Sequence, residues 1–165
     1  MILHAGLIAL RAGGDWRGAL IQGPSGAGKS DLALRALDAG FRLVADDRVL
    51  VWLSGGAHYG RAPDTLRGLI EARGQGLWRE SPLPLCRIVV ALACVADGVA
   101  IERMPEPEIQ IVAGKPLPRL TIDPREASAP AKVRRAIEHL GAAGQQAYLA
   151  ASLGGRGRAG TGDTH

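Results

Sequence analysis

The chain has 165 residues, of which 47% are apolar and 22% charged, and its formal net charge is +4. This length and composition predict one globular domain, and no apolar run approaches the roughly 20 residues that cross a bilayer. The positive charge is small and dispersed, so we expect neither a nucleic-acid partner nor a membrane partner. The first residues lack the basic stretch of a signal peptide, which predicts a cytoplasmic location.

The first half of the chain alternates short apolar runs with turns and one helical segment. Apolar runs without helical spacing are expected to form strands, and a glycine such as Gly40 is typical of the residue that follows a helix. In chain order, we expect strands at 3–10 and 18–22, a helix at 31–38, strands at 42–45 and 49–53, a loop at 57–68 and an extended segment at 69–73.

The second half contains the most apolar run of the chain, 86–95, which is typical of a central strand buried on both faces. Cys86 and Cys94 both lie on this run, and we interpret them as reduced core thiols that bind no metal. A proline-rich segment at 105–118 is expected to carry one short strand. A helix is expected at 129–140, with Ser128 as its N-cap.

Beyond residue 141 the sequence predicts an Ala/Gln-rich helix and then a glycine-rich end, which we expect to be disordered. We therefore expect one domain at 1–145 and a C-terminal tail at 146–165. The many strands and few helices do not alternate regularly. This pattern predicts an α/β fold with a mixed, partly antiparallel sheet.

A complete phosphate-binding motif, G-x-x-x-x-G-K-[ST], stands between the strand at 18–22 and the helix at 31–38. Its glycines let backbone N–H groups surround phosphate oxygens, and the helix N-terminus adds partial positive charge. Lys29 is expected to contact the β- and γ-phosphates of ATP, and the Ser30 hydroxyl to ligate Mg²⁺. The alternative is a glycine-rich turn that only caps the helix. The residues of this nucleotide-binding P-loop are Gly23, Pro24, Ser25, Gly26, Ala27, Gly28, Lys29 and Ser30.

Two adjacent carboxylates, Asp46 and Asp47, follow the short strand at 42–45. Ends of neighbouring strands in an α/β sheet open onto the same crevice, so we expect the pair near the phosphate loop. One carboxylate can hold a metal or its water, and the other can accept a proton from an attacking hydroxyl. The alternative is a charged turn between two strands.

These motifs together resemble the catalytic domain of the HPr kinase/phosphorylase family. The resemblance rests on His4-Ala5, on the segments 23–37 and 40–49, and on Glu71-Ala-Arg-Gly-Gln-Gly76. It implies a fold similar to the nucleotide-binding core of phosphoenolpyruvate carboxykinase. It also implies an ATP- and Mg²⁺-dependent serine kinase acting on HPr, the phosphocarrier of the sugar phosphotransferase system, with removal of the phosphate by phosphorolysis in many members.

The resemblance also implies roles for individual residues. Ser30 and Glu71 would hold Mg²⁺, and Lys29 would contact phosphate. Asp47 would accept the proton of the target serine, Asp46 would support the metal or position Asp47, and His4 would orient the acidic pair. Arg103 is our candidate for a further positive charge on the transferred phosphate. Family members assemble as hexamers, so a homo-oligomer is expected.

The sequence also departs from most of the family. The sequence resembles the short form of the family found in alpha-proteobacteria, so we expect no counterpart of the N-terminal domain typical of the family. Segment 116–132 lacks the loop associated with dephosphorylation. Two other functions are compatible with the motifs: a small-molecule P-loop kinase, and a nucleotide-binding regulatory module without catalysis. The apolar, proline-rich segment 85–120 does not favour the first, and the intact Asp47 and Glu71 do not favour the second.

Overall fold

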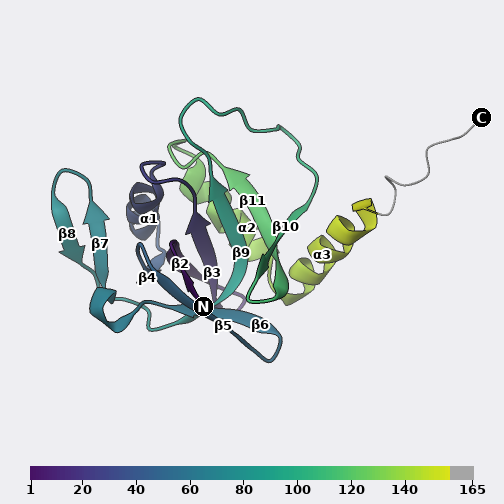
Figure 1. Cartoon of the computed structure of the whole chain (residues 1–165), viewed down its shortest axis with the longest axis horizontal. Coiled ribbons are helices and arrows are strands. Elements are labelled where there is room, and N and C mark those ends of the chain that lie inside the picture. The colour runs from purple at the N-terminus through teal and green to yellow at the C-terminus, as the bar shows by residue number, and fades with distance from the viewer. Residues whose placement is uncertain (157–165) are drawn as a thin grey trace, which may run out of the picture.

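A computed structural model describes residues 1–156, which form one mixed sheet, a separate two-stranded sheet and three α-helices (Figure 1). The main sheet has the strand order β1-β5-β6-β9-β3-β2-β4, and β11 joins it beside β9 with β10 outside. The elements are β1 (Ile2–Leu3), β2 (Gly6–Ala12), β3 (Asp15–Gln22), α1 (Lys29–Asp38), β4 (Arg42–Ala45), β5 (Val49–Ser54), β6 (Ala57–Arg61), a 3₁₀ turn (Asp64–Leu66), β7 (Leu69–Ala72), β8 (Gly76–Arg79), β9 (Cys86–Cys94), β10 (Glu108–Val112), β11 (Lys115–Ile122), α2 (Ala129–His139) and α3 (Ala142–Arg156).

The central strand β9 explains why the sheet is curled and mixed. One edge of β9 pairs in parallel with β3 along its length. Its other edge pairs first with antiparallel β6 and then with parallel β11. One strand therefore carries three partners, and the sheet divides there. The predicted α/β fold with a partly antiparallel sheet is confirmed.

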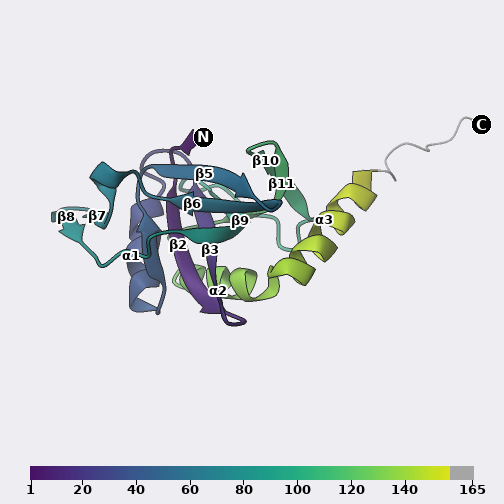
Figure 2. The same ribbon diagram turned by 90° about the horizontal axis from the view of Figure 1, so that it is seen from below.

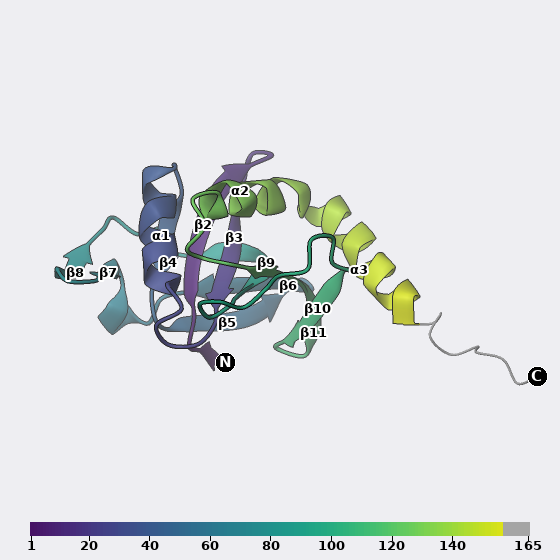
Figure 3. The same cartoon turned by 90° about the horizontal axis from the view of Figure 1, so that it is seen from above.

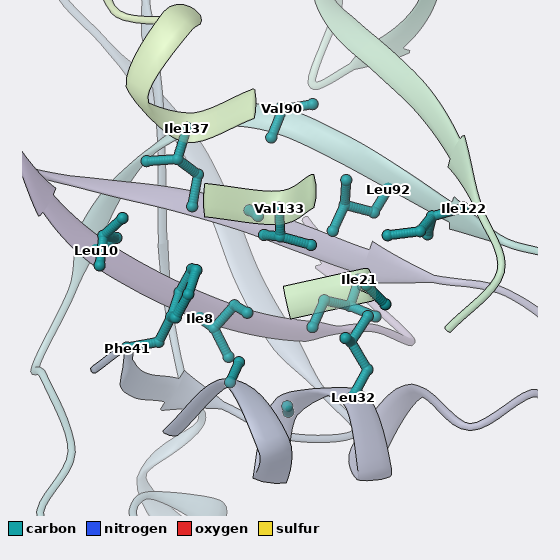
Figure 4. Close-up of a cluster of buried hydrophobic side chains, with 14 of the residues drawn as sticks. Ile8, Leu10, Ile21, Leu32, Phe41, Val90, Leu92, Ile122, Val133 and Ile137 are labelled. Atoms are coloured by element: carbon teal, nitrogen blue, oxygen red, sulfur yellow. The ribbon is translucent and has the colours of Figure 1, made fainter. Parts of the chain in front are cut away.

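Alternating side chains of the central strands bury two faces. In β2, Ile8 and Leu10 point to the face that α1 and α2 cover, whereas Leu7 and Ala9 point to the opposite face. Figure 4 shows the first of these clusters, in which Val133 of α2 lies over the strands. Figures 2 and 3 show α2 on one side of β2 and β3, with the β5–β6 hairpin on the other.

Several predicted boundaries were wrong. The expected loop at 57–68 contains β6, because its Ala-His-Tyr-Gly-Arg sequence has no apolar run and its strand character comes from pairing with β5 and β9. Segment 105–118 contributes to two strands instead of one. Pro116 and Pro118 are tolerated because β11 pairs with β9 only from Arg119 onward. The expected first strand, 3–10, is divided between β1 and β2.

The C-terminal helix is described as far as Arg156. Tyr148 ties it to the body, since its hydroxyl donates to the carbonyl of Arg119 and accepts from the N–H of Glu108. Most of the glycine-rich end predicted to be disordered lies outside the described residues. Ser128 precedes α2 as predicted, but its side chain makes no capping hydrogen bond.

Candidate active site

The glycine-rich loop at 23–28 connects the end of β3 to the start of α1, as its motif predicts. Gly28 precedes the helix with a φ of 104°, and Gly26 has a φ of 79°. Residues that carry a side chain rarely adopt these left-handed backbone conformations, whereas glycine adopts them readily, so the two glycines allow the turn. The N–H of Ala27 donates to the carbonyl of Pro24, 3.1 Å away, which closes the loop on itself. The loop therefore ends at the N-terminus of a ten-residue helix, where partial positive charge favours an anion.

Lys29 is folded back over this loop. Its Nζ donates to the carbonyl oxygens of Gly23, at 2.7 Å, and Pro24, at 2.9 Å. The ammonium group is thus held above the loop by the loop's own backbone. This position concentrates positive charge where the motif predicts phosphate.

A buried carboxylate joins three elements beside the loop. Ser30 donates through Oγ to Asp46, 2.9 Å from Oδ1 and 3.1 Å from Oδ2. The backbone N–H of Glu71 also donates to Oδ2 of Asp46, at 3.1 Å. Asp46 is only 8% exposed, and these two donors replace the water molecules that an exposed carboxylate would bind. The end of β4, the first turn of α1 and strand β7 are thereby fixed relative to one another.

Asp47 differs sharply from its neighbour. Its side chain is 59% exposed and lies 2.8 Å from Nε2 of His4, measured from Oδ1. Nη1 of Arg48 is 3.5 Å from its Oδ2. The φ of Asp47 is 70°, a conformation that aspartate and asparagine adopt more readily than most residues. One carboxylate of the pair is therefore buried and hydrogen-bonded, and the other is open to an incoming molecule.

A cavity of about 280 Å³ brings these groups together. It is lined by residues of the glycine-rich loop and α1, by both aspartates, and by His4 and Glu71. The residues that the sequence singled out at 4, 25–26, 28–30, 46–47 and 71 thus border one space. Gly23, Pro24 and Ala27 belong to the loop but are not among its lining residues.

Arg103, which the sequence suggested as a further positive charge on the phosphate, and Arg73 differ in their position relative to the cavity. Arg103 is exposed on the segment between β9 and β10 and is not among the residues that line the cavity. Arg73 does line it, two positions after Glu71 and directly after the last residue of β7. The alternation of apolar and charged residue types from Ile70 to Arg73 is the signal that could have identified it, since residues two apart on a strand share a face.

The oxygen atoms at the cavity fit Mg²⁺. Ser30, Asp46 and Glu71 supply a hydroxyl and two carboxylates, and Mg²⁺ prefers oxygen ligands. Within residues 1–156, no group of three or more His, Cys, Asp or Glu side chains could hold a metal by itself. Mg²⁺ is commonly bound by one or two carboxylates together with substrate phosphates, so this donor set is compatible with a nucleotide-bound ion.

Comparison with known proteins relates this half of the chain to one family. Residues 4–79 match the family described as HPr Serine kinase C-terminal domain. An HPr kinase/phosphorylase of Mycoplasmopsis pulmonis is 44% identical over 78 residues, which are 43% of this chain and 25% of that protein. One from Leptothrix cholodnii is 51% identical over 61 residues, 36% of this chain and 19% of that protein. The chain thus spans a quarter or less of the length of these two curated relatives.

The likeness in fold extends further along the chain. The solved structure of the Hpr(Ser) kinase/phosphatase from Coxiella burnetii has a TM-score of 0.70 at 19% identity, covering 83% of this chain and 93% of that one. The α/β fold with its curled mixed sheet is therefore one already known. Across the described part of the chain, none of the helices has the length and apolar character needed to cross a membrane.

Proposed function

We propose that the chain belongs through residues 4–79 to the HPr serine kinase C-terminal domain family, and that it transfers phosphate from ATP to a serine of the HPr phosphocarrier protein. The observation that carries the proposal is the exposed carboxylate of Asp47 in the same cavity as Lys29 and Ser30. A kinase of this kind needs a proton acceptor that a protein substrate can reach, beside a cradle for the γ-phosphate.

On this proposal Asp47 accepts the proton of the serine hydroxyl as the serine oxygen bonds to the γ-phosphorus and the bond to ADP breaks. His4, 2.8 Å from Oδ1, orients that carboxylate. Asp47 would return a proton to the serine oxygen in phosphorolysis, in which an oxygen of inorganic phosphate bonds to the phosphorus of phosphoserine HPr, the bond to the serine oxygen breaks and pyrophosphate leaves. Inorganic phosphate would then take the place that ADP has in the kinase reaction, and we include phosphorolysis in the proposal.

The remaining site residues would bind and position. The loop at 23–30 would serve as a P-loop, with Lys29 on the phosphates, in a domain similar to the nucleotide-binding core of phosphoenolpyruvate carboxykinase. Ser30 and Glu71 would hold Mg²⁺, and Asp46 would fix Ser30 through the hydrogen bonds described above. Bound Mg²⁺ would supply positive charge that neutralises the transferred phosphoryl group. Arg73 lines the cavity and is a second source of such charge, alongside the sequence-based candidate Arg103.

We further propose that the protein acts in the cytoplasm as a homo-oligomer, a hexamer by analogy with the family, without nucleic-acid or membrane partners. Light scattering of the purified chain measures the oligomeric state directly. A monomer at micromolar concentration would contradict that part of the proposal and leave the kinase assignment standing.

Mass spectrometry of HPr after incubation with the chain, ATP and Mg²⁺ tests the kinase function. We expect HPr to gain one phosphate on serine, and a serine-to-alanine HPr to gain none. The variant Asp47→Asn keeps a residue suited to the left-handed backbone and should reduce the rate about 100-fold or more. Asp64→Asn is the matched control, because Asp64 is an exposed carboxylate outside the cavity, paired with Arg61.

The alternatives give different results in the same assay. ATP turnover in the presence of small metabolites without modification of HPr would support a small-molecule kinase. Nucleotide binding without any turnover would support a regulatory module. Either result would overturn the proposal. Comparing Arg73→Gln with Arg103→Gln distinguishes the two arginines, because only the one that contacts the transferred phosphate should lower the rate about tenfold or more.

A further inference from the structure

A second groove, of about 550 Å³, lies at the end of the sheet away from the glycine-rich loop. Its walls come from the β5–β6 turn, the first residues of β9 and β11, and the first turns of α3. Arg17 of β3 is paired with Arg87 of β9 at this end, whereas Gln22 precedes the glycine-rich loop. Arg17 and Gln22 are five positions apart on β3, which is about 16 Å of strand at about 3.3 Å per residue, so the two sites lie at opposite ends of this strand. In Figure 1 the tips of the β5–β6 and β10–β11 hairpins and the start of α3 all lie toward this end of the sheet.

The groove carries positive charge that has no acidic partner. Arg87, Lys115 and His58 line it, and its lining residues include no aspartate or glutamate. Among residues 1–156, neither Arg87 nor Lys115 forms an ion pair, whereas Lys132 on α2 is paired with Glu126. Arg87 and Lys115 therefore place two positive charges in this groove without an acidic partner among the described residues.

The guanidinium group of Arg87 is only partly satisfied by hydrogen bonds within the protein. Its Nε is buried and has no hydrogen-bond partner among the described residues. Nη2 donates to Oε1 of Gln145 on α3, at 3.3 Å, and Gln145 is itself fixed by a 2.9 Å bond from Nε2 to the carbonyl of Val89. Buried N–H donors are nearly always satisfied, so this positioned guanidinium carries more donors than the described residues satisfy.

The rest of the lining suits an anion as well. His58 is 4% exposed and its Nε2 lies 2.8 Å from the carbonyl of Val112, so this ring has a fixed orientation in the wall. Ala142 begins the 15-residue helix α3, and Gln145 and Gln146 follow in its first turns. A helix N-terminus adds partial positive charge and free N–H groups to the two cations.

We propose that this groove binds a small phosphate-bearing organic anion, at a site separate from the nucleotide cavity. The planar donor array of Arg87 matches a phosphoryl group, and Lys115 supplies a point charge beside it. The cavity volume exceeds that of inorganic phosphate alone, so a phosphomonoester with a small organic body fits the space better. Because the sites lie at opposite ends of β3 and β9, such an anion binds without displacing a nucleotide.

Nuclear magnetic resonance of the full chain tests the site residue by residue, whatever the protein's activity. Glycerol 3-phosphate and inorganic phosphate are the probes, and glycerol with sodium chloride at matched ionic strength is the blank. We expect glycerol 3-phosphate to shift the Arg87 Nε–H and Gln145 side-chain amide signals along one saturable curve. Signals from Gly26 and Gly28 report the other cavity in the same spectra, so binding there is separated from binding at the groove.

Lys115→Gln should weaken glycerol 3-phosphate binding at the groove about tenfold while the protein stays folded, because Lys115 is exposed at the start of β11. Lys132→Gln removes the same charge outside the groove and should leave the curve unchanged. An Arg87 signal that does not move up to about 20 mM probe would overturn the proposal, as this is far weaker than ordinary metabolite affinities. Equal affinity in Lys115→Gln, or binding of inorganic phosphate but not glycerol 3-phosphate, would overturn it too.

Discussion

Ser30 and Asp46 are joined by a hydrogen bond of 2.9 Å between the serine Oγ and the aspartate Oδ1. This contact connects the first turn of α1 to the residue that follows β4. The same carboxylate accepts the backbone N–H of Glu71 from β7. Asp46 is therefore a structural centre of the site, whereas Asp47, the next residue, faces the cavity with most of its side chain exposed.

The two aspartates should consequently respond differently to substitution. Asp46→Ala leaves the Ser30 hydroxyl and the Glu71 N–H without their buried acceptor, so we expect the free energy of unfolding to fall by about 1–3 kcal/mol. Asp47→Asn keeps the left-handed backbone and removes only an exposed charge, so we expect a change of less than about 0.5 kcal/mol. Urea denaturation measures both. Equal losses in the two variants would contradict the distinction.

Local patterns in the sequence predicted the strand–loop–helix unit around residues 23–30 and the position of Asp46 and Asp47 after β4. Each depends on residues that are close in the chain. The pairing of His4 with Asp47 spans 43 positions, and only the resemblance to a family suggested it. Arg103 was selected by position along the chain, and the path of the long segment between β9 and β10 has no periodic pattern to fix it. Arg73 lies within the motif at 71–76 but was assigned no role, because its exposure toward the cavity depends on where β7 packs.

Strand β6 was not predicted because its strand character also depends on its neighbours in the sheet, β5 and β9. Gly60 of β6 has no side chain because a Cβ there would lie 2.7 Å from Leu7 Cδ2 and 3.0 Å from Ile88 Cδ1. We expect Gly60→Ala to lower the free energy of unfolding by about 1–3 kcal/mol through overpacking.

Gly6→Ala is the matched control for Gly60→Ala. A Cβ at Gly6, on the neighbouring part of the same sheet, would meet its nearest atoms at 3.6 Å or more, which is ordinary contact. We expect a change of no more than about 1 kcal/mol, of either sign. Thermal and urea unfolding of both variants measure the difference, and a Gly60→Ala protein as stable as Gly6→Ala would show that β6 can shift away from the core.

A third prediction concerns the attachment of α3. Tyr148→Phe removes the hydroxyl that accepts from the Glu108 N–H, at 2.8 Å, and donates to the Arg119 carbonyl, at 3.0 Å. We expect a loss of about 1–2 kcal/mol and faster amide exchange in α3. Hydrogen exchange read by mass spectrometry on the α3 peptide measures the local effect, with peptides of α1 as the internal control.

The same tyrosine gives that loss a pH dependence. Burial raises the pKa of Tyr148 above its ordinary value of 10, so the folded state favours the protonated hydroxyl. The stability that this preference contributes is present below pH 10 and is lost as the pH rises through the higher folded-state pKa. The difference between wild type and Tyr148→Phe should therefore shrink above pH 10. A difference that grows with pH there would contradict the burial of this hydroxyl.

The two cysteines should be unreactive in the folded protein. Burial, with a smaller contribution from Asp15, raises the pKa of the Cys86 thiol to about 12. Burial also raises the pKa of Cys94 to about 11, against the opposing charge of Lys29. The thiolate is the form that reacts with alkylating reagents, so at pH 8 Cys94 should react about 100-fold, and Cys86 about 1,000-fold, more slowly than an ordinary thiol.

Iodoacetamide labelling followed by mass spectrometry measures this directly, with the urea-unfolded chain as the positive control. We expect two labels in urea and none in the native protein over the same time.

The raised pKa values of the two thiols also imply that the free energy of unfolding falls as the pH rises from about 9, where an unfolded thiol ionises, toward the folded-state pKa of each thiol. Rapid native labelling of Cys94 alone would mean that the end of β9, against which Gly23 packs, opens locally; a Cβ on Gly23 would lie only 2.6 Å from the Cys94 carbonyl oxygen. Such opening would loosen the base of the glycine-rich loop, so the labelling pattern also reports how firmly the sheet holds the site.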